Sequence, residues 1–216
     1  MNRRRSFLPV LMLTATAALT LSACGSDDGT AKRDEKTQRA DEGSDQPVSP
    51  DSSAAVGRPR IELPEDLTLV FEGSGTEGPE QDAVLADNAE RMRAVDAAIA
   101  AADPGSEALG FYNTGKALEA AVSWVGQFQE ANATVTGEVR YFDRRVTLKD
   151  ESSAVLTFCA DESKGFSKDR KTGKVAKTPV TQNSYVLYDT RLDRNTDGVW
   201  QTSQIVSTRG ATQCQP

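Results

Sequence analysis

The stretch Thr134–Leu148, TVTGEVRYFDRRVTL, decides the fold. It is rich in Val, Thr, Tyr and Phe, and apolar residues alternate with polar ones at a period of two. This pattern is typical of a strand with one buried face. Asp143 interrupts the alternation, and we expect the strand to kink there.

Further strands are predicted on the C-terminal side of this stretch. Asn195–Gly198, NTDG, is a strong hairpin signal, and the polar, lysine-rich segment 163–177 is typical of an exposed loop. The predicted strands are Ser153–Asp161, Gln182–Leu192 and Val199–Thr208.

Helices are predicted on the N-terminal side. An apolar residue recurs at steps of three and four through Gln81–Ala102, which predicts an amphipathic helix that ends at Asp103-Pro104-Gly105. A similar pattern predicts a second helix over Lys116–Glu130, and a short helix or turn between the two would place Phe111 and Tyr112. Before the helices, Leu67–Phe71 reads as a short β-type stretch.

Helices followed by consecutive antiparallel strands predict an α+β fold, with N-terminal helices packed on a curved antiparallel sheet. We expect residues 61–216 to form this single domain. The order of elements over Gln81–Cys214 resembles the nuclear transport factor two superfamily, also called the cystatin-like cone. Three details add to the resemblance: Thr136-Gly137-Glu138, Cys159-Ala160-Asp161 and the final cysteine, Cys214. The resemblance implies a cone-like domain with an interior that could hold a ligand.

The first residues indicate export. Arg3, Arg4 and Arg5 precede an apolar run that ends at Leu21-Ser22-Ala23-Cys24, as in a signal peptide. This end resembles the lipobox of bacterial lipoproteins, which implies cleavage after residue 23 and acylation of Cys24. The simpler alternative is an ordinary signal peptidase site. Arg4-Arg5-Ser6-Phe7-Leu8 also partly resembles a twin-arginine signal, so either export route is possible.

Residues 24–60 are polar and acidic and contain no aromatic residue. Such a segment buries too little apolar surface to fold, and we expect a disordered tether. The formal net charge of the chain is −7, and loss of the three leader arginines would make it more negative by three. An acidic chain is repelled by nucleic acid and by anionic headgroups, so we expect membrane contact through the lipid and no nucleic-acid binding.

Three cysteines occur in the chain. With Cys24 acylated, Cys159 and Cys214 remain as an even pair in an oxidising compartment, and we expect a disulfide between them. Two free thiols are the alternative. No Cys-x-x-Cys motif is present, and the chain contains no histidine, so we expect neither a redox pair nor a metal site.

The absence of histidine also excludes Ser-His-Asp and Cys-His nucleophilic schemes. No phosphate-binding glycine loop is present, and we expect no cofactor. Polar or aromatic residues that could border a pocket are Tyr112, Trp124, Tyr141 and Asp161, although each also fits a core or solvent position.

The sequence therefore predicts a lipoprotein on the extracytoplasmic face of the cell membrane. Its domain would be a non-catalytic module that binds an envelope protein or a small ligand. The alternative is a small-molecule enzyme of the cone type, such as a cyclase or isomerase, with an acid or base in the cone mouth. A purely structural role in the envelope is a third hypothesis.

Overall fold

The structure is a computed structural model that describes residues 57–73 and 78–216. The predicted leader, Cys24 and nearly all of the predicted tether lie outside these residues. The described elements, in chain order, are β1 (Leu67–Phe71), α1 (Pro79–Ala101), α2 (Glu107–Tyr112), α3 (Gly115–Glu130), β2 (Ala133–Leu148), β3 (Ser153–Asp169), β4 (Val175–Ala176), η2 (Gln182–Ser184), β5 (Tyr185–Arg194), β6 (Trp200–Arg209) and η3 (Thr212–Cys214).

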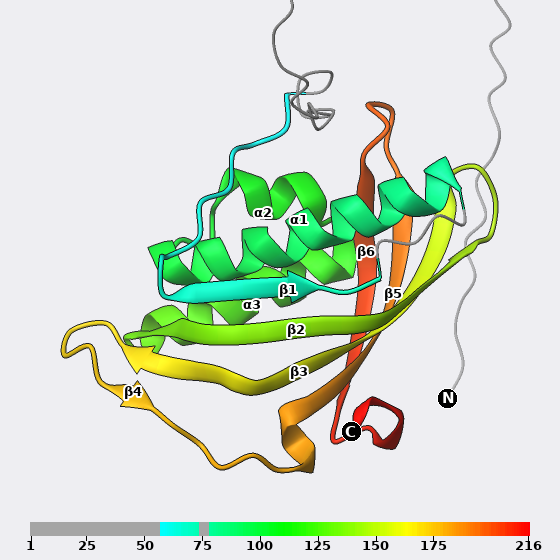
Figure 1. Cartoon of the computed structure of the whole chain (residues 1–216). Coiled ribbons are helices and arrows are strands. Elements are labelled where there is room, and N and C mark those ends of the chain that lie inside the picture. The colour runs from blue at the N-terminus through cyan, green and yellow to red at the C-terminus, as the bar shows by residue number, and fades with distance from the viewer. Residues whose placement is uncertain (1–56, 74–77) are drawn as a thin grey trace, which may run out of the picture. The chain divides into compact units, whose positions relative to one another are not determined.

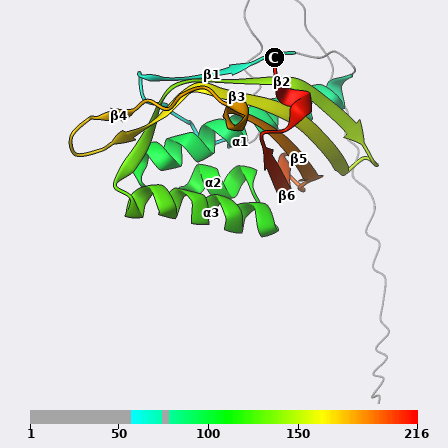
Figure 2. The same cartoon turned by 90° about the horizontal axis from the view of Figure 1, so that it is seen from below.

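The fold class is α+β, as predicted. Six strands form one sheet in the order β1-β2-β3-β5-β6, with β4 paired to β3. The three helices lie on one face of this sheet, and α1 runs across it (Figures 1 and 2). The predicted helix boundaries agree with α1 and α3 to within two residues, and the short helix α2 carries Phe111 and Tyr112.

The first strand departs from the predicted antiparallel sheet. β1 pairs with β2 in parallel, with Leu67 opposite Gly137 and Phe71 opposite Tyr141. The connection from β1 to β2 contains three helices, so the chain crosses back over the sheet and re-enters it in the same direction. The remaining strand pairs are antiparallel.

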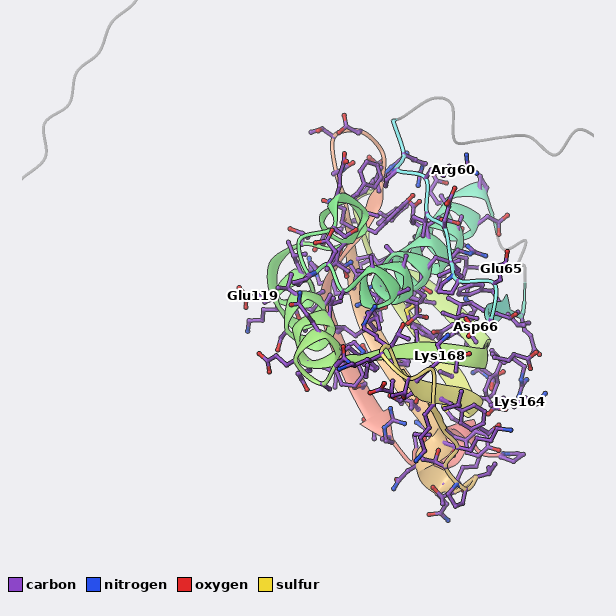
Figure 3. The ribbon with its side chains drawn as sticks, turned by 90° about the vertical axis from the view of Figure 1, so that its left-hand side faces the viewer. Arg60, Glu65, Asp66, Glu119, Lys164 and Lys168 are labelled. Atoms are coloured by element: carbon purple, nitrogen blue, oxygen red, sulfur yellow. A yellow bond between two sulfur atoms is a disulfide. The ribbon has the colours of Figure 1, made fainter. Side chains whose placement is uncertain are left out.

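The segment 163–177 was predicted as a loop, and this is wrong for its first half. β3 continues to Asp169 because the N-terminal half of β2 requires a hydrogen-bonding partner: Glu138 lies opposite Lys164 and Ala133 opposite Asp169. Two lysines of this stretch form surface ion pairs, Lys164 with Glu138 and Lys168 with Asp66. Lys164, Lys168 and Asp66 are labelled in Figure 3. Backbone pairing therefore decides the structure here, whereas composition suggested a loop. Residues 182–184, predicted to begin a strand, form the short helix η2.

Two irregularities bend β2. The pairing with β3 shifts register between Glu138 and Arg140 and again between Phe142 and Arg145, and Asp143 has a φ of 49°. The kink predicted at Asp143 is thus confirmed. Since bulges bend and twist a strand, the sheet curves around α1 (Figure 2).

The largest core cluster lies between α1 and the concave face of the sheet. Leu156, Phe158 and Ala160 of β3 pack there with Val84 and Met92 of α1 and other side chains of the cluster. α1 is buried on more than its apolar stripe, because the sheet, α2 and α3 surround it. As a result it carries three buried polar residues, Asp87, Asn88 and Arg91.

Candidate functional site

A cavity of about 560 Å³ opens between α1, α3 and the concave face of the sheet. The curvature of the sheet leaves this space because α1 fills only part of the concave face. Side chains from β1, β2, β3, β5 and β6 complete its wall. A partly open cavity of this size is in the usual range for small-molecule sites.

Apolar residues form most of the wall. Met92, Val95 and Ile99 come from α1, at the helical steps of three and four. Trp124 and Phe128 of α3 also line the cavity and pack edge to face, with ring centroids 5.1 Å apart. Trp124 is 46% exposed, which places its ring where the cavity meets solvent. The strands contribute further apolar side chains, Leu67, Val135, Val139, Phe166 and Ile205.

Several polar side chains also line the cavity: Arg91, Asp96, Tyr141, Glu162, Tyr188 and Arg209 are the titratable ones. Glu162 and Arg209 form an ion pair of 2.7 Å, and the Arg209 side chain is half exposed, so this pair belongs to the solvent side. Arg91 and Tyr141 are 5% and 4% exposed. Polar groups are thus present at both the buried and the open parts of the cavity.

Arg91 is a buried cation held by neutral partners. Its Nε donates to Asn113 Oδ1 at 2.7 Å, and its Nη1 contacts Met92 Sδ at 3.2 Å. Asn113 in turn donates to the Leu109 carbonyl oxygen at 2.8 Å, which fixes the amide. Burial lowers the pKa of Arg91, but a guanidinium remains protonated in proteins. Within the described part of the chain, no carboxylate forms an ion pair with it.

Asp96 is the acidic group of the α1 face that lines the cavity. Burial raises its pKa to about 7, the negative charge of Glu162 adds to this rise, and Arg91 opposes it. The side chain keeps some solvent access, since Asp96 is only partly buried by area. The pKa values of Tyr141 and Tyr188 are also raised, in both cases chiefly by burial. Asp96 therefore exchanges its proton near neutral pH, whereas the two phenols stay protonated.

The pocket residues predicted from the sequence separate into two groups. Trp124 and Tyr141 line the cavity. Tyr112 lies in another core cluster with Ala108 and Val199, and is 1% exposed. Asp161 is not among the lining residues: it pairs with Arg140 at 3.4 Å and accepts a hydrogen bond from the backbone N–H of Ser163.

Sequence reasoning missed Arg91, Asp96, Glu162 and Tyr188. A usable signal was present for the first two, because residues 91, 92, 95, 96 and 99 share one face of a helix. Two opposite charges within an apolar stripe indicate a buried polar site. Glu162 and Tyr188 carried no such signal, since only the pairing of β3 with β5 and the curvature of the sheet bring them to α1.

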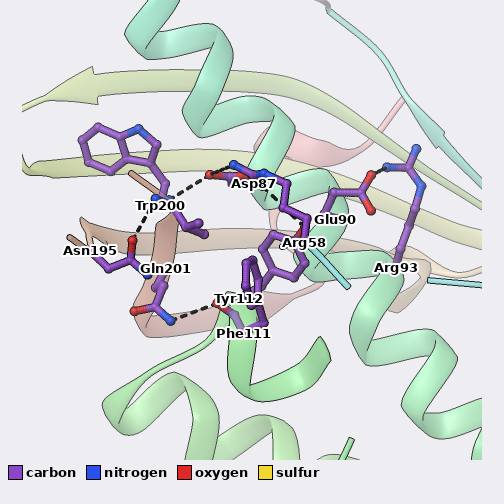
Figure 4. Close-up of polar contacts among 10 residues, drawn as sticks. Arg58, Asp87, Glu90, Arg93, Phe111, Tyr112, Asn195, Trp200 and Gln201 are labelled. Carbon is purple, nitrogen blue, oxygen red and sulfur yellow. Dashed lines mark hydrogen bonds and ion pairs between the residues drawn. The ribbon is translucent and has the colours of Figure 1, made fainter. Parts of the chain in front are cut away.

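A second polar cluster lies outside the cavity (Figure 4). Arg58 forms an ion pair with Asp87 of α1, and Asp87 also accepts a hydrogen bond from the backbone N–H of Trp200 at 2.8 Å. The Arg58 guanidinium lies over the Tyr112 ring, 5.9 Å from its centroid. These contacts fasten the segment before β1 to the helices and to β6.

A disulfide joins Cys159 of β3 to Cys214 of η3, as predicted. Both cysteines are buried, and Ala211 completes their cluster, with Phe142, Tyr185 and Leu187 packed against it. The bond holds the C-terminal turn against the sheet. In the described ranges, no helix is both long and apolar enough to cross a bilayer. Nor do those residues include a group of three or more side chains arranged to hold a metal ion.

No protein-family model matches the chain, and no curated protein is detectably similar to it in sequence. Similar solved structures include a ketosteroid isomerase-like protein from Erwinia carotovora atroseptica, at 16% identity and a TM-score of 0.39, over 61% of this chain and 97% of that one. The intermembrane space region of chloroplast protein ARC6 is similar at 11% identity and a TM-score of 0.39, over 59% and 97%.

A putative ketosteroid isomerase from Shewanella frigidimarina is similar at 10% identity and a TM-score of 0.31, over 64% of this chain and 99% of that one. At these values the similarities assign neither a family nor an activity, so the functional argument rests on the cavity.

Proposed function

We propose that the domain binds a small, predominantly apolar molecule in the cavity, and that a lipid on Cys24 holds it at the outer face of the cell membrane. The observation that carries the binding proposal is a cavity of about 560 Å³ whose wall is more apolar than polar and includes several polar side chains. Natural ligand sites combine these features, because apolar walls supply affinity and isolated polar groups orient the ligand. The lipid anchor rests on the lipobox resemblance at Leu21–Cys24.

The two tryptophans allow a direct test. Trp124 lines the cavity, whereas Trp200 is 1% exposed and lies in the core. Phenylnaphthylamine, a neutral fluorophore that brightens in apolar sites, should bind saturably and quench the emission of Trp124. Trp124→Phe should reduce the quenching and keep the brightening. A folded protein without saturable binding would contradict the proposal.

A matched pair of variants locates the binding. Ala120 is exposed and lines the cavity, and its neighbour Glu119 is exposed and does not line it. Ala120→Trp should narrow the entrance and weaken phenylnaphthylamine binding about tenfold or more, equivalent to about 1.4 kcal/mol. Glu119→Trp should leave the affinity unchanged. Equal effects of the two substitutions would place the probe elsewhere.

The second candidate function is acid–base catalysis on such a ligand. It is favoured by one observation: the Asp96 carboxyl has a pKa of about 7 and lines the same cavity as Tyr141 and Tyr188. A carboxyl raised by an apolar environment suits proton transfer near neutral pH. Exchange of deuterium from an α-deuterated cyclic ketone, followed by NMR, would test it. Wild-type protein should accelerate the exchange and Asp96→Asn should not; no acceleration by the wild type would contradict catalysis.

A further inference from the structure

The buried charge of Arg91 lacks an anion. The residue is 5% exposed, yet its nitrogens meet only the amide oxygen of Asn113 and the sulfur of Met92. Among the described residues, the hydrogen bonds of Arg91 come from Nε and Nη1 and none from Nη2, which is not one of the fully buried atoms without a partner. Buried cations are ordinarily paired, because desolvation is costly without a counter-charge. Arg91 lines the cavity, so a bound ligand could supply that charge.

The neighbouring groups favour an anion over a cation. Asp96, Tyr141 and Tyr188 are the titratable groups that lie close enough to Arg91 to affect its pKa. The two phenols are hydrogen-bond donors at neutral pH, and the protonated form of Asp96 is a third donor. Glu162 already has a partner in Arg209. When Asp96 is protonated, the buried part of the cavity therefore carries one uncompensated positive charge.

The apolar part of the cavity wall indicates the chemical character of the part of the ligand that does not contact Arg91. Met92, Val95 and Ile99 of α1 face the aromatic side chains of α3 and the strand residues Val135 and Val139 in the cavity lining. An apolar body fits this wall, and a charged one does not. A planar guanidinium binds a carboxylate through two parallel N–H donors. These two hydrogen bonds make the interaction strong and fix the orientation of the carboxylate.

We propose that the ligand is an amphipathic monocarboxylate, with its carboxylate on the Arg91 guanidinium and its apolar body along the wall formed by α1 and α3. This inference rests on the proposed function, since it specifies the molecule that the cavity binds. Asp96 then acts as a proton switch for binding: its neutral form donates to the ligand, and its ionised form repels it.

The proton switch predicts a direction for the pH dependence. The charged and titratable groups that face Asp96 are Arg91 on α1, Tyr141 on β2, Glu162 on β3, Tyr188 on β5 and Arg209 on β6. Burial raises the pKa of Asp96 to about 7. Binding of a carboxylate should therefore weaken about tenfold between about pH 6 and about pH 8, as expected for uptake of one proton.

The test is displacement of phenylnaphthylamine from the full domain by three ligands of equal chain length: dodecanoate, dodecanol and dodecylammonium, each below its micellar concentration. Wild-type protein should prefer dodecanoate over both others by about tenfold at pH 6. Arg91→Met should lose this preference while it still binds dodecanol and the fluorophore. Arg93→Met, which removes the same charge from the same helix outside the cavity lining, should keep the preference.

Asp96→Asn provides an independent measurement if Arg91→Met fails to fold. It should bind dodecanoate at pH 8 as tightly as wild-type protein does at pH 6. Equal affinity for dodecanoate and dodecanol in wild-type protein would overturn the carboxylate inference and leave the proposed function intact. Preference for dodecylammonium that Asp96→Asn abolishes would also overturn it. Absence of fluorophore binding, together with no heat of dodecanoate binding in calorimetry, would instead overturn the proposed function itself.

Discussion

At the scale of single residues, α1 is unusual in the charged groups that it buries fully or in part. Asp87, Arg91 and Asp96 all lie within one helix that the sheet and the other helices surround. The cost of removing each charge from water is offset in a different way. Asp87 forms an ion pair with Arg58, and Arg91 donates a hydrogen bond to the neutral amide of Asn113. Asp96 takes up a proton. The stability of the domain should therefore respond differently to substitution at each position.

Asp96 should make the domain less stable as pH rises. Its pKa is about 7 in the folded protein and 3.8 in an unperturbed carboxyl, so the native state holds a proton that the unfolded chain has released between these values. The stabilisation is present below the unfolded pKa and is lost as pH rises to about 7. Asp96→Asn should raise the free energy of unfolding by about 2 kcal/mol near pH 8, which is about half the full linkage value because the side chain keeps some solvent access.

Urea unfolding of both proteins, near pH 4 and near pH 8, measures this effect. The two proteins should differ near pH 8 and agree near pH 4, where the carboxyl is protonated in the native state. An equal difference at both pH values would mean that the substitution acts through packing.

Arg58→Met should destabilise the domain by about 3 kcal/mol, because it leaves the carboxylate of Asp87 buried without a counter-charge. Arg60→Met is the matched control: its ion pair with Glu62 is largely exposed, so the loss should stay below about 0.5 kcal/mol. Thermal unfolding of the two variants checks the prediction. The double variant Arg58→Met/Asp87→Asn should recover part of the loss, and no recovery would argue against the ion pair as the cause.

Sequence patterns predicted only part of the candidate site at the scale of single residues. Charge at positions 91 and 96 is visible in the sequence, but charged residues on helices usually face solvent. Arg91 is buried and Asp96 partly buried because α1 crosses a curved sheet, which is a tertiary property. Trp124 and Tyr141, which the sequence offered as possible pocket residues, line the cavity, but aromatic residues are common in both cores and pockets, so the pattern alone does not separate the two.

At the scale of elements, the long β2–β3 pair organises the domain. It extends along most of both strands and includes two register shifts, which no period-two pattern could locate except at Asp143. Residues 163–169 were the main error, since their polarity and glycine are typical of loops. The helices and the NTDG hairpin were predicted well because apolar residues recur at steps of three and four in the helices and turn residues mark the hairpin.

Gly137→Ala should disturb the β2–β3 pair. Gly137 has a φ of 99°, and an added Cβ would collide with the carbonyl oxygen of Lys164 on the paired strand. We expect a loss of about 2–3 kcal/mol from the strained backbone and the clash together. Gly126→Ala on α3 is the control, since nothing lies within 4 Å of the added Cβ and a helical alanine is favoured. Chemical denaturation should therefore show opposite signs for the two variants.

The disulfide should contribute most of the stability of the C-terminal turn. Cys159 and Cys214 enclose a long loop, with a sequence separation of 55, and the chain-entropy model gives about 4 kcal/mol for such a bond. Replacement of both cysteines by alanine should lower the free energy of unfolding by about this amount. Wild-type protein treated with a reductant should match the double variant; a reductant without effect would contradict the prediction.

At the scale of the whole molecule, the proposed anchor makes a cellular prediction. Cys24→Ser should abolish incorporation of labelled palmitate and move the protein from the membrane to the soluble fraction, because no lipid would then attach. Cys214→Ser should stay with the membrane. Immunoblots of the two fractions check this, and a membrane-bound Cys24→Ser protein would contradict the lipid anchor.

Under the proposed lipid anchor, a pulling force on the domain would arrive from the N-terminal side, where Arg58 pairs with Asp87. A force applied to the chain before Arg58 acts first on the Arg58–Asp87 ion pair. It acts next on β1, which is held by its parallel hydrogen bonds to β2. Under load, the ion pair should rupture first and β1 should peel away next, while β3, β5 and β6 keep their shape. The N-terminal contacts would thus break first under a pulling force, and the cavity would keep its shape until they had broken.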